Sequence, residues 1–129
     1  MKKQPIGAIT WFDLTVPNAD TIRDFYGSVT GWKPEPVGMG DYNDYNMTEP
    51  ESGNPVAGIC NARGVNAGLP AHWLLYVNVA DIETSATKCV ELGGKLLTPI
   101  KSMGSMGRYC VIQDPAGAVA GLFEERDEV

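Results

Sequence analysis

The chain has 129 residues, a formal net charge of −6 and a sequence pI of about 4.6, with 43% hydrophobic and 20% charged residues. This size allows one globular domain with a hydrophobic core and is small for two ordinary domains. The ten Lys and Arg residues are scattered rather than gathered in a basic stripe, so we expect no nucleic-acid partner.

The segment MKKQPIGAITWF has no apolar run of signal-peptide length, and no stretch approaches the roughly 20 apolar residues of a membrane span. We therefore expect a cytoplasmic protein with no membrane partner. Three cysteines, at positions 60, 89 and 110, form neither an even set nor a CxxC motif. Their spacing predicts reduced thiols, with no disulfide framework and no zinc knuckle.

The first predicted element is a strand over 8–16, whose alternation places Trp11, Asp13 and Thr15 on one face. Pro17–Asp20 predicts a turn in which Asn or Asp caps a helix. That helix carries an apolar stripe at i, i+3, i+4 and i+7, and Gly31 is placed to end it; the stripe is Ile22, Phe25, Tyr26 and Val29. Three shorter strands follow over 33–37, 42–48 and 55–61.

A Gly-rich linker over 62–70 precedes a second series of the same elements. It consists of a strand over 72–79, a helix from 81 or 82 to 92 closed by Gly93-Gly94, and strands over 95–99, 107–113 and 118–124. The two halves also match in sequence: Trp11 falls on Trp73 at a shift of 62, and 56–59 resembles 119–122 at a shift of 63. We predict two copies of one βαβββ unit, about 7–61 and 71–125, within a single domain.

This pattern resembles the vicinal oxygen chelate superfamily, which includes glyoxalase I, extradiol dioxygenases and bleomycin and fosfomycin resistance proteins. The similarity is carried by FDLTVPNADTIRDFYGSVTGW, YVNVADIETSATKCVELGGKLLTP and GRYCVIQDPAGAVAGLFE and covers about residues 7–125. It implies an α+β fold in which two βαβββ modules form a curled mixed sheet around a shared cleft. Enzymes of the superfamily bind a divalent metal in that cleft.

The resemblance places the usual metal ligands near the start of each module's first strand and on its last strand. These positions fall on Trp11 and Leu74, and on Gly58 and Gly121, none of which can ligate a metal. If the alignment with the superfamily were shifted by one or two residues, His72, Asp13 and Cys60 would fall at ligand positions. A single histidine would still leave too few metal ligands. We therefore predict no metal and no other cofactor.

Strand alternation and the adjacent Met-Gly loops predict the residues that line the cleft. The predicted ligand-binding residues are Trp11, Asp13, Tyr42, Tyr45, Gly58, Cys60, His72, Leu74, Tyr76, Arg108, Tyr109, Gly121 and Phe123.

Several of these residues have a purely structural alternative. Trp11 forms either an aromatic wall for a ligand or a filler of the space that a metal site would leave. Each cleft glycine either admits a flat ligand or relieves crowding between sheets. Arg108 holds an anionic group or pairs with a neighbouring acid on the surface, which we favour. Cys60 has no evident partner base, so inert packing is favoured.

Asp13 is the weak catalytic candidate, because burial beside an indole raises the pKa of a carboxylate toward that of a general base. The interpretation we favour is a protein that binds a small, partly aromatic or apolar molecule in a metal-free cleft. The alternative is a metal-dependent or metal-free lyase, isomerase or dioxygenase, which would need a Lewis acid or Asp13 as its base. A third hypothesis is that an exposed strand edge or helix face mediates self-association. We expect a homodimer.

Overall fold

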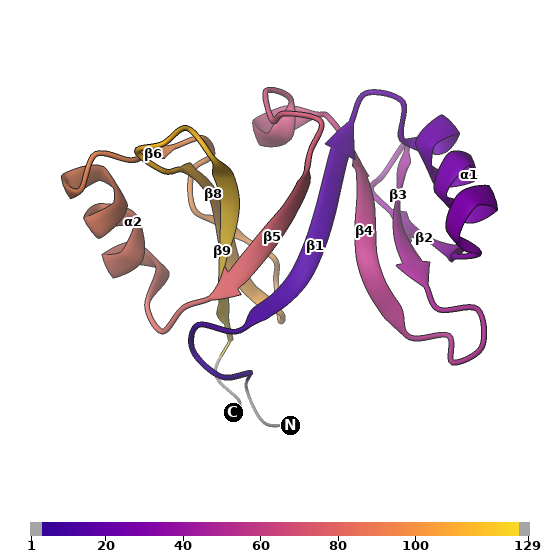
Figure 1. Ribbon diagram of the computed structural model, residues 1–129, viewed down its shortest axis with the longest axis horizontal. Helices are drawn as coiled ribbons and strands as arrows, with labels where there is room; N and C mark the ends of the chain where they lie inside the picture. The colour runs from indigo at the N-terminus through magenta and orange to yellow at the C-terminus, as the bar shows by residue number, and fades with distance from the viewer. Residues whose placement is uncertain (1–3, 127–129) are drawn as a thin grey trace. The chain divides into compact units, whose positions relative to one another are not determined.

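The computed structural model describes residues 4–126, which form two βαβββ series in chain order (Figure 1). The first series is β1 (Ile9–Val16), α1 (Ala19–Thr30), β2 (Lys33–Gly38), β3 (Asn43–Thr48) and β4 (Pro55–Asn61). A 3₁₀ turn, η1 (Gly64–Asn66), lies in the linker. The second series is β5 (Trp73–Asn78), α2 (Ile82–Glu91), β6 (Lys95–Leu96), β7 (Lys101–Ser102), β8 (Gly107–Gln113) and β9 (Val119–Glu125).

The chain divides into two units, which we call module one (residues 11–73) and module two (residues 4–10 with 74–126). The N-terminal segment belongs to module two because Gly7 N donates to Asn78 O at 2.7 Å and Asn78 N donates to Ala8 O at 2.8 Å. The predicted repeat had placed residues 7–10 with the first copy. The single-domain organisation stays a prediction.

Module one is a sheet in the order β2-β3-β4-β1, with α1 packed on one face (Figure 1). β1 and β4 are parallel, and the other pairs are antiparallel. Apolar side chains from alternate strand positions face α1 and form the core; they are Leu14, Val16, Tyr45, Met47 and Ile59, joined by Ala19 of α1. The opposite sheet face therefore carries the other half of each strand.

The helix α1 ends as predicted, because Gly31 adopts the left-handed conformation at φ 82° and its N–H donates to Gly27 O. Its apolar stripe is only partly buried: Ile22 and Tyr26 pack against the core, whereas Phe25 is 55% and Val29 65% exposed. Asn18 occupies the N-cap position without a side-chain cap hydrogen bond, so the predicted cap is wrong for this helix.

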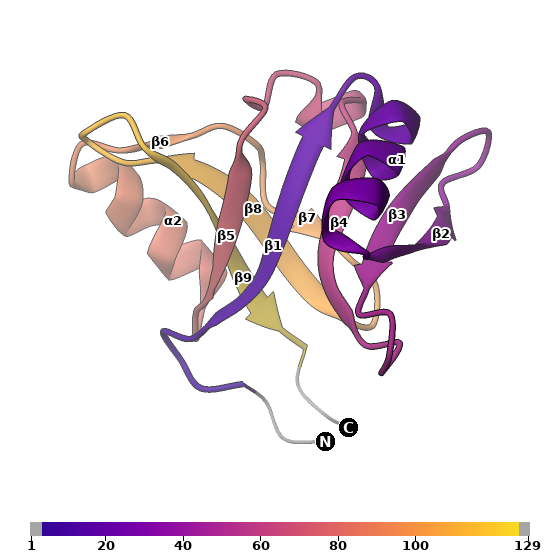
Figure 2. The same cartoon turned by 45° about the vertical axis from the view of Figure 1, so that its right-hand side comes forward.

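The strand β2 is the terminal strand of module one and pairs only with β3 along the sheet order (Figure 2). Its sequence KPEPVG contains Pro34 and Pro36 at alternate positions, opposite Met47 and Tyr45. Since proline has no N–H, these residues cannot occupy hydrogen-bonded positions of the β2–β3 ladder. Their nitrogen atoms therefore lie along the free edge of the sheet.

Module two has the order β5-β9-β8-β6, with β7 also paired to β8 (Figure 2). β5 and β9 are parallel, and α2 packs on the sheet face that carries Cys110 and Leu122. The predicted start of this helix at 81 or 82 is confirmed, and Asp81 is its N-cap, accepting hydrogen bonds from Glu83 N at 3.1 Å and Thr84 N at 3.3 Å. No helix among residues 4–126 is long and apolar enough to cross a bilayer.

The predicted strand over 95–99 is regular only at Lys95–Leu96. Beyond it, the N–H groups of Leu97 and Thr98 both donate to Val111 O, at 2.8 and 3.3 Å. Thr98 Oγ1 accepts from Val111 N at 2.9 Å in place of a backbone carbonyl. This side-chain substitution ends the regular ladder, and the short strand β7, which was not predicted, resumes pairing with β8.

The parallel strand pairs of the two modules repeat at a shift of 63. Asp13 lies opposite Gly58 in the parallel β1–β4 pair, and Tyr76 lies opposite Gly121 in the parallel β5–β9 pair, 63 positions later on both strands (76 − 13 and 121 − 58). Trp11 therefore corresponds to Leu74, and the match of Trp11 to Trp73 at a shift of 62 was one residue out of register. The predicted α+β fold class and the two βαβββ modules are confirmed.

Candidate functional site

The sheet face of module one opposite α1, here called the helix-distal face, carries Trp11, Asp13, Thr15, Asp44, Asn46, Gly58 and Cys60. Trp11 and Asp13 stand two residues apart on β1 and point the same way. The indole Nε1–H donates to Asp13 Oδ1 at 2.6 Å, and both side chains are half-buried. The sequence predicted this shared face, and the structure adds the direct hydrogen bond.

Gly58 lies on β4 directly opposite Asp13. A Cβ atom at this position would overlap Asp13 Oδ1 and would lie 3.3 Å from Trp11 Nε1. The space above the glycine is thus filled by the chain's own carboxylate and indole. Of the two interpretations of Gly58, relief of crowding is therefore sufficient to explain the residue.

Asp44 on β3 completes a polar group with Asp13 and Cys60. Its Oδ1 accepts hydrogen bonds from Asn61 N at 2.9 Å and Asn61 Nδ2 at 3.0 Å. The Cys60 thiol is hydrogen-bonded to Asp44. Sequence reasoning did not select Asp44, although alternation along Asn43–Thr48 separates it from Tyr45 and places it on the helix-distal face.

Burial controls the protonation of this group. Desolvation raises the pKa of Asp13 from 3.8 to about 6, with a smaller contribution from the charge of Asp44 and an opposing one from the Trp11 hydrogen bond. The prediction that burial raises this pKa is confirmed. Desolvation also raises the pKa of the Cys60 thiol, and the charges of Asp13 and Asp44 raise it further, so the thiolate is disfavoured and inert packing is supported.

The donor set does not fit a divalent metal. The four positions that the superfamily resemblance assigns to ligands hold an indole, a leucine and two glycines. Among residues 4–126 no group of three or more His, Cys, Asp or Glu side chains is arranged to hold a metal ion. His72, which lies exposed just before β5, thus forms no metal-binding trio with Asp13 and Cys60.

The corresponding face of module two is aromatic. Tyr76 and Tyr109 meet edge to face, with ring centroids 6.3 Å apart and an interplanar angle of 68°. The Tyr76 ring covers Gly121, where a Cβ atom would overlap it, and Phe123 pairs with Tyr109 across β8 and β9. Leu74 is buried one alternate position before Tyr76. In module one the Asp13 carboxylate covers Gly58, and in module two the Tyr76 ring covers Gly121 in the same way.

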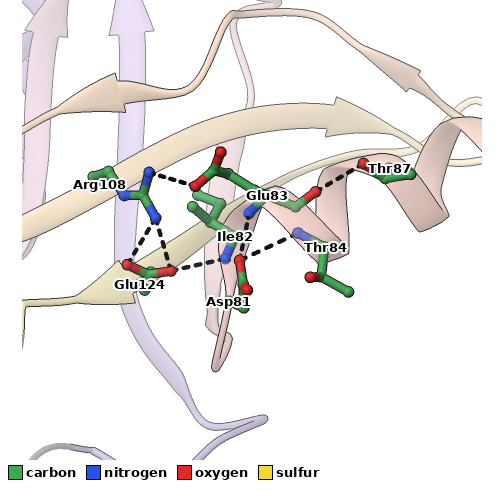
Figure 3. Close-up of polar contacts among 7 residues, drawn as sticks. All are labelled: Asp81, Ile82, Glu83, Thr84, Thr87, Arg108 and Glu124. Carbon is green, nitrogen blue, oxygen red and sulfur yellow. Dashed lines mark hydrogen bonds and ion pairs between the residues drawn. The ribbon is translucent and has the colours of Figure 1, made fainter.

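Arg108 lies on the other face of module two, toward α2. Its guanidinium donates to Glu83 Oε1 and to both carboxylate oxygens of Glu124, each at 3.1 Å (Figure 3). Glu124 Oε1 also accepts from Ile82 N at 2.9 Å, at the first residue of α2. Arg108 therefore pairs with neighbouring acids, as the favoured alternative predicted. This arrangement gives no support to anion binding by Arg108.

The two tyrosines of module one that were predicted to bind a ligand, Tyr42 and Tyr45, both make internal contacts. Tyr45 is buried under α1, where its hydroxyl donates to Asp20 Oδ1 at 2.7 Å and accepts from Arg23 Nη1 at 2.9 Å. The Arg63 guanidinium carbon lies 4.1 Å from the ring centroid of Tyr42. Tyr45 therefore belongs to the core, and Tyr42 stacks with an arginine of the linker.

The structure thus defines an α+β protein of paired βαβββ modules with a carboxylate–indole pair on one sheet. Comparison with known families gives a more specific assignment: residues 8–120 match the model of the Glyoxalase/Bleomycin resistance protein/Dioxygenase superfamily. The chain belongs to this superfamily, which confirms the resemblance found in the sequence.

Two kinds of relative illustrate the similarity. "Putative glyoxylase CFP32" of Mycobacterium tuberculosis is 32% identical over 123 residues, covering 92% of this chain and 46% of that protein. "Anthracycline biosynthesis protein DnrV" of Streptomyces peucetius is 28% identical over 135 residues, covering 92% and 47%. The chain therefore spans about half the length of the curated relatives it matches.

Solved structures share the fold at low sequence identity. Methylmalonyl-CoA epimerase from Mycobacterium tuberculosis aligns with a TM-score of 0.59 at 14% identity, covering 98% of this chain and 94% of that one. A superfamily member from Vibrio splendidus 12B01 aligns with a TM-score of 0.57 at 15% identity, covering 88% and 96%. Identities this low support the fold and leave the activity to be argued from the site.

Proposed function

We propose that the chain binds a small, partly aromatic or apolar molecule against the helix-distal face of module one, without a resident metal ion. The observation that carries this proposal is the Trp11–Asp13 pair over Gly58. An indole stands at a position where the resemblance would place a metal ligand, and a partly buried carboxylate follows two residues later on the same strand face. Such a combination supplies an aromatic surface and a single directional polar contact, as small-molecule sites commonly do.

The relative named for anthracycline biosynthesis supports an aromatic ligand, because anthracyclines are flat polycyclic aromatic compounds. The proposal includes a cytoplasmic location and a homodimer. Light scattering of the purified chain tests the homodimer, and a monomer mass at micromolar concentration would contradict it.

The ligand-binding proposal is tested by extracting the purified protein for mass spectrometry and by titrating it with 2-naphthylmethanol, followed by NMR. We expect saturable shifts that disappear in Trp11→Ala and persist in Phe12→Ala. Phe12 is the matched control, because it neighbours Trp11 on the other side of β1 and is 43% exposed. Equal loss of binding in both variants, or no binding to the wild type, would contradict the proposed site.

The metal-free part is tested separately. Adding Ni, Zn, Mn or Fe ions should leave Tm unchanged, since a ligand of the folded state raises Tm in a saturable manner. A saturable rise with any one of these ions would overturn this part.

A second function, metal-free proton transfer, is favoured by one observation. Asp13 has a pKa of about 6, close to the value that suits a general base near neutral pH. In this case the molecule recovered from the protein would exchange a C–H proton for deuterium in heavy water with the wild type. Exchange that Asp13→Asn abolishes would identify an enzyme, and absence of exchange favours binding alone.

A further inference from the structure

Two carboxylates on the helix-distal face of module one, those of Asp13 and Asp44, have no ion-pair partner among residues 4–126. Both approach the same thiol. The groups that influence Asp13 are its own burial, the Trp11 hydrogen bond and the charge of Asp44, with no cation among them. A partly buried carboxylate with no countercharge is costly to the folded protein.

Among residues 4–126, one oxygen of Asp13 also has no hydrogen-bond donor. Oδ1 accepts from Trp11 Nε1, and within residues 4–126 no donor reaches Oδ2. Because the indole fixes Oδ1, the carboxylate cannot rotate to satisfy Oδ2 without breaking the 2.6 Å hydrogen bond. The free acceptor is therefore held in place beside an aromatic ring.

The strand register extends this arrangement across the sheet. Asp13, Gly58, Asn46 and Glu35 lie in one row over β1, β4, β3 and β2. Gly58 contributes no side chain, so the row presents a carboxylate, a carboxamide and a second carboxylate. The two ionisable side chains in this row, Asp13 and Glu35, are both acidic. The net charge of the whole chain is also negative, at −6. Both the local and the overall field attract cations and repel anions.

We propose, building on the proposed function, that the ligand carries a protonated amine which Asp13 Oδ2 holds beside the Trp11 indole. An ammonium group supplies the missing countercharge and donates to the unpartnered oxygen. The indole beside the carboxylate offers an aromatic surface to the rest of the molecule. The ligand class is therefore an aromatic or apolar molecule bearing a cationic nitrogen.

The experiment compares three probes that share one ring system: 2-(aminomethyl)naphthalene, 2-naphthylmethanol and 2-naphthoate, each titrated at neutral pH and followed by NMR. We expect the amine to bind about tenfold tighter than the alcohol, and the carboxylate to bind weakest. Asp13→Asn should lower the affinity for the amine to that for the alcohol and leave the alcohol affinity unchanged. Asp41→Asn is the matched control, because it removes the same charge from a side chain that is 88% exposed.

The outcomes separate this inference from the proposed function. Equal binding of the amine and the alcohol to the wild type overturns the cation preference and leaves small-molecule binding intact. Failure of all three probes overturns both. If Asp13→Asn loses the alcohol as well as the amine, Asp13 shapes the site without selecting charge, and the inference is wrong. An equal loss of amine affinity in Asp41→Asn would assign the effect to net charge and would also overturn it.

Discussion

Replacing Asp13 by Asn should stabilise the protein at neutral pH. Asn keeps an Oδ1 that accepts from Trp11 Nε1, but it removes the buried charge. The carboxyl pKa rises from 3.8 to about 6 on folding. Because a change of one in pKa is worth about 1.4 kcal/mol, ionised Asp13 lowers the free energy of unfolding by about 3 kcal/mol.

The sign follows from proton linkage. Between about pH 4 and pH 6 the folded state holds more protons on Asp13 than the unfolded state does, so this residue's contribution to stability falls as pH rises. The advantage of Asp13→Asn should therefore be small near pH 4, grow through that window, and level off above about pH 6.

Urea unfolding followed by tryptophan fluorescence at several pH values measures this difference, with the exposed Asp41→Asn as the control. A stability difference that does not change with pH, or a variant less stable than wild type at neutral pH, would refute the reasoning. If the prediction holds, the charge is retained at a cost to stability, as is common for binding sites.

Gly58→Ala should lower the free energy of unfolding by about 1–3 kcal/mol, because the added Cβ would overlap the Asp13 carboxylate. Gly38→Ala is the control and should have no such effect, since no atom lies within 4 Å of a Cβ there. Equal Tm values for the two variants would contradict this contact. Ellman's reagent at mildly alkaline pH should modify Cys89 before Cys60, since burial and two carboxylates disfavour the Cys60 thiolate; peptide mapping that finds Cys60 labelled first would be inconsistent with the site described. Glu124→Gln should lower Tm and increase hydrogen exchange at the start of α2. The substitution weakens both the ion pair with Arg108 and the hydrogen bond from Ile82 N. Unchanged exchange there would show that the carboxylate charge is dispensable.

Much of the fold could be predicted because its signals are local. Gly31 ends α1 through a positive φ, and Asp81 begins α2 through its side chain, each within a few residues of the sequence. The break after Leu96 could not be predicted, since it depends on the Thr98 hydroxyl reaching Val111, thirteen positions away. Such contacts exist only once the strands have paired.

The site could be predicted in part for a related reason. Alternation along one strand placed Trp11 and Asp13 together. By the same rule, Arg108 and Tyr109, adjacent on β8, face opposite sides of the sheet and do not form one binding surface. The lack of an ion-pair partner for Asp13 could not be predicted from alternation. It depends on which Lys and Arg side chains lie near β1 in the folded protein.

The proline pair of β2 has a consequence for assembly. Along the free edge of this strand, the positions of Pro34 and Pro36 offer carbonyl acceptors but no donors. A neighbouring chain that tried to add a strand there would find half of the necessary hydrogen bonds missing, which protects the molecule from edge-to-edge aggregation. Any homodimer must accordingly form through a surface other than this edge.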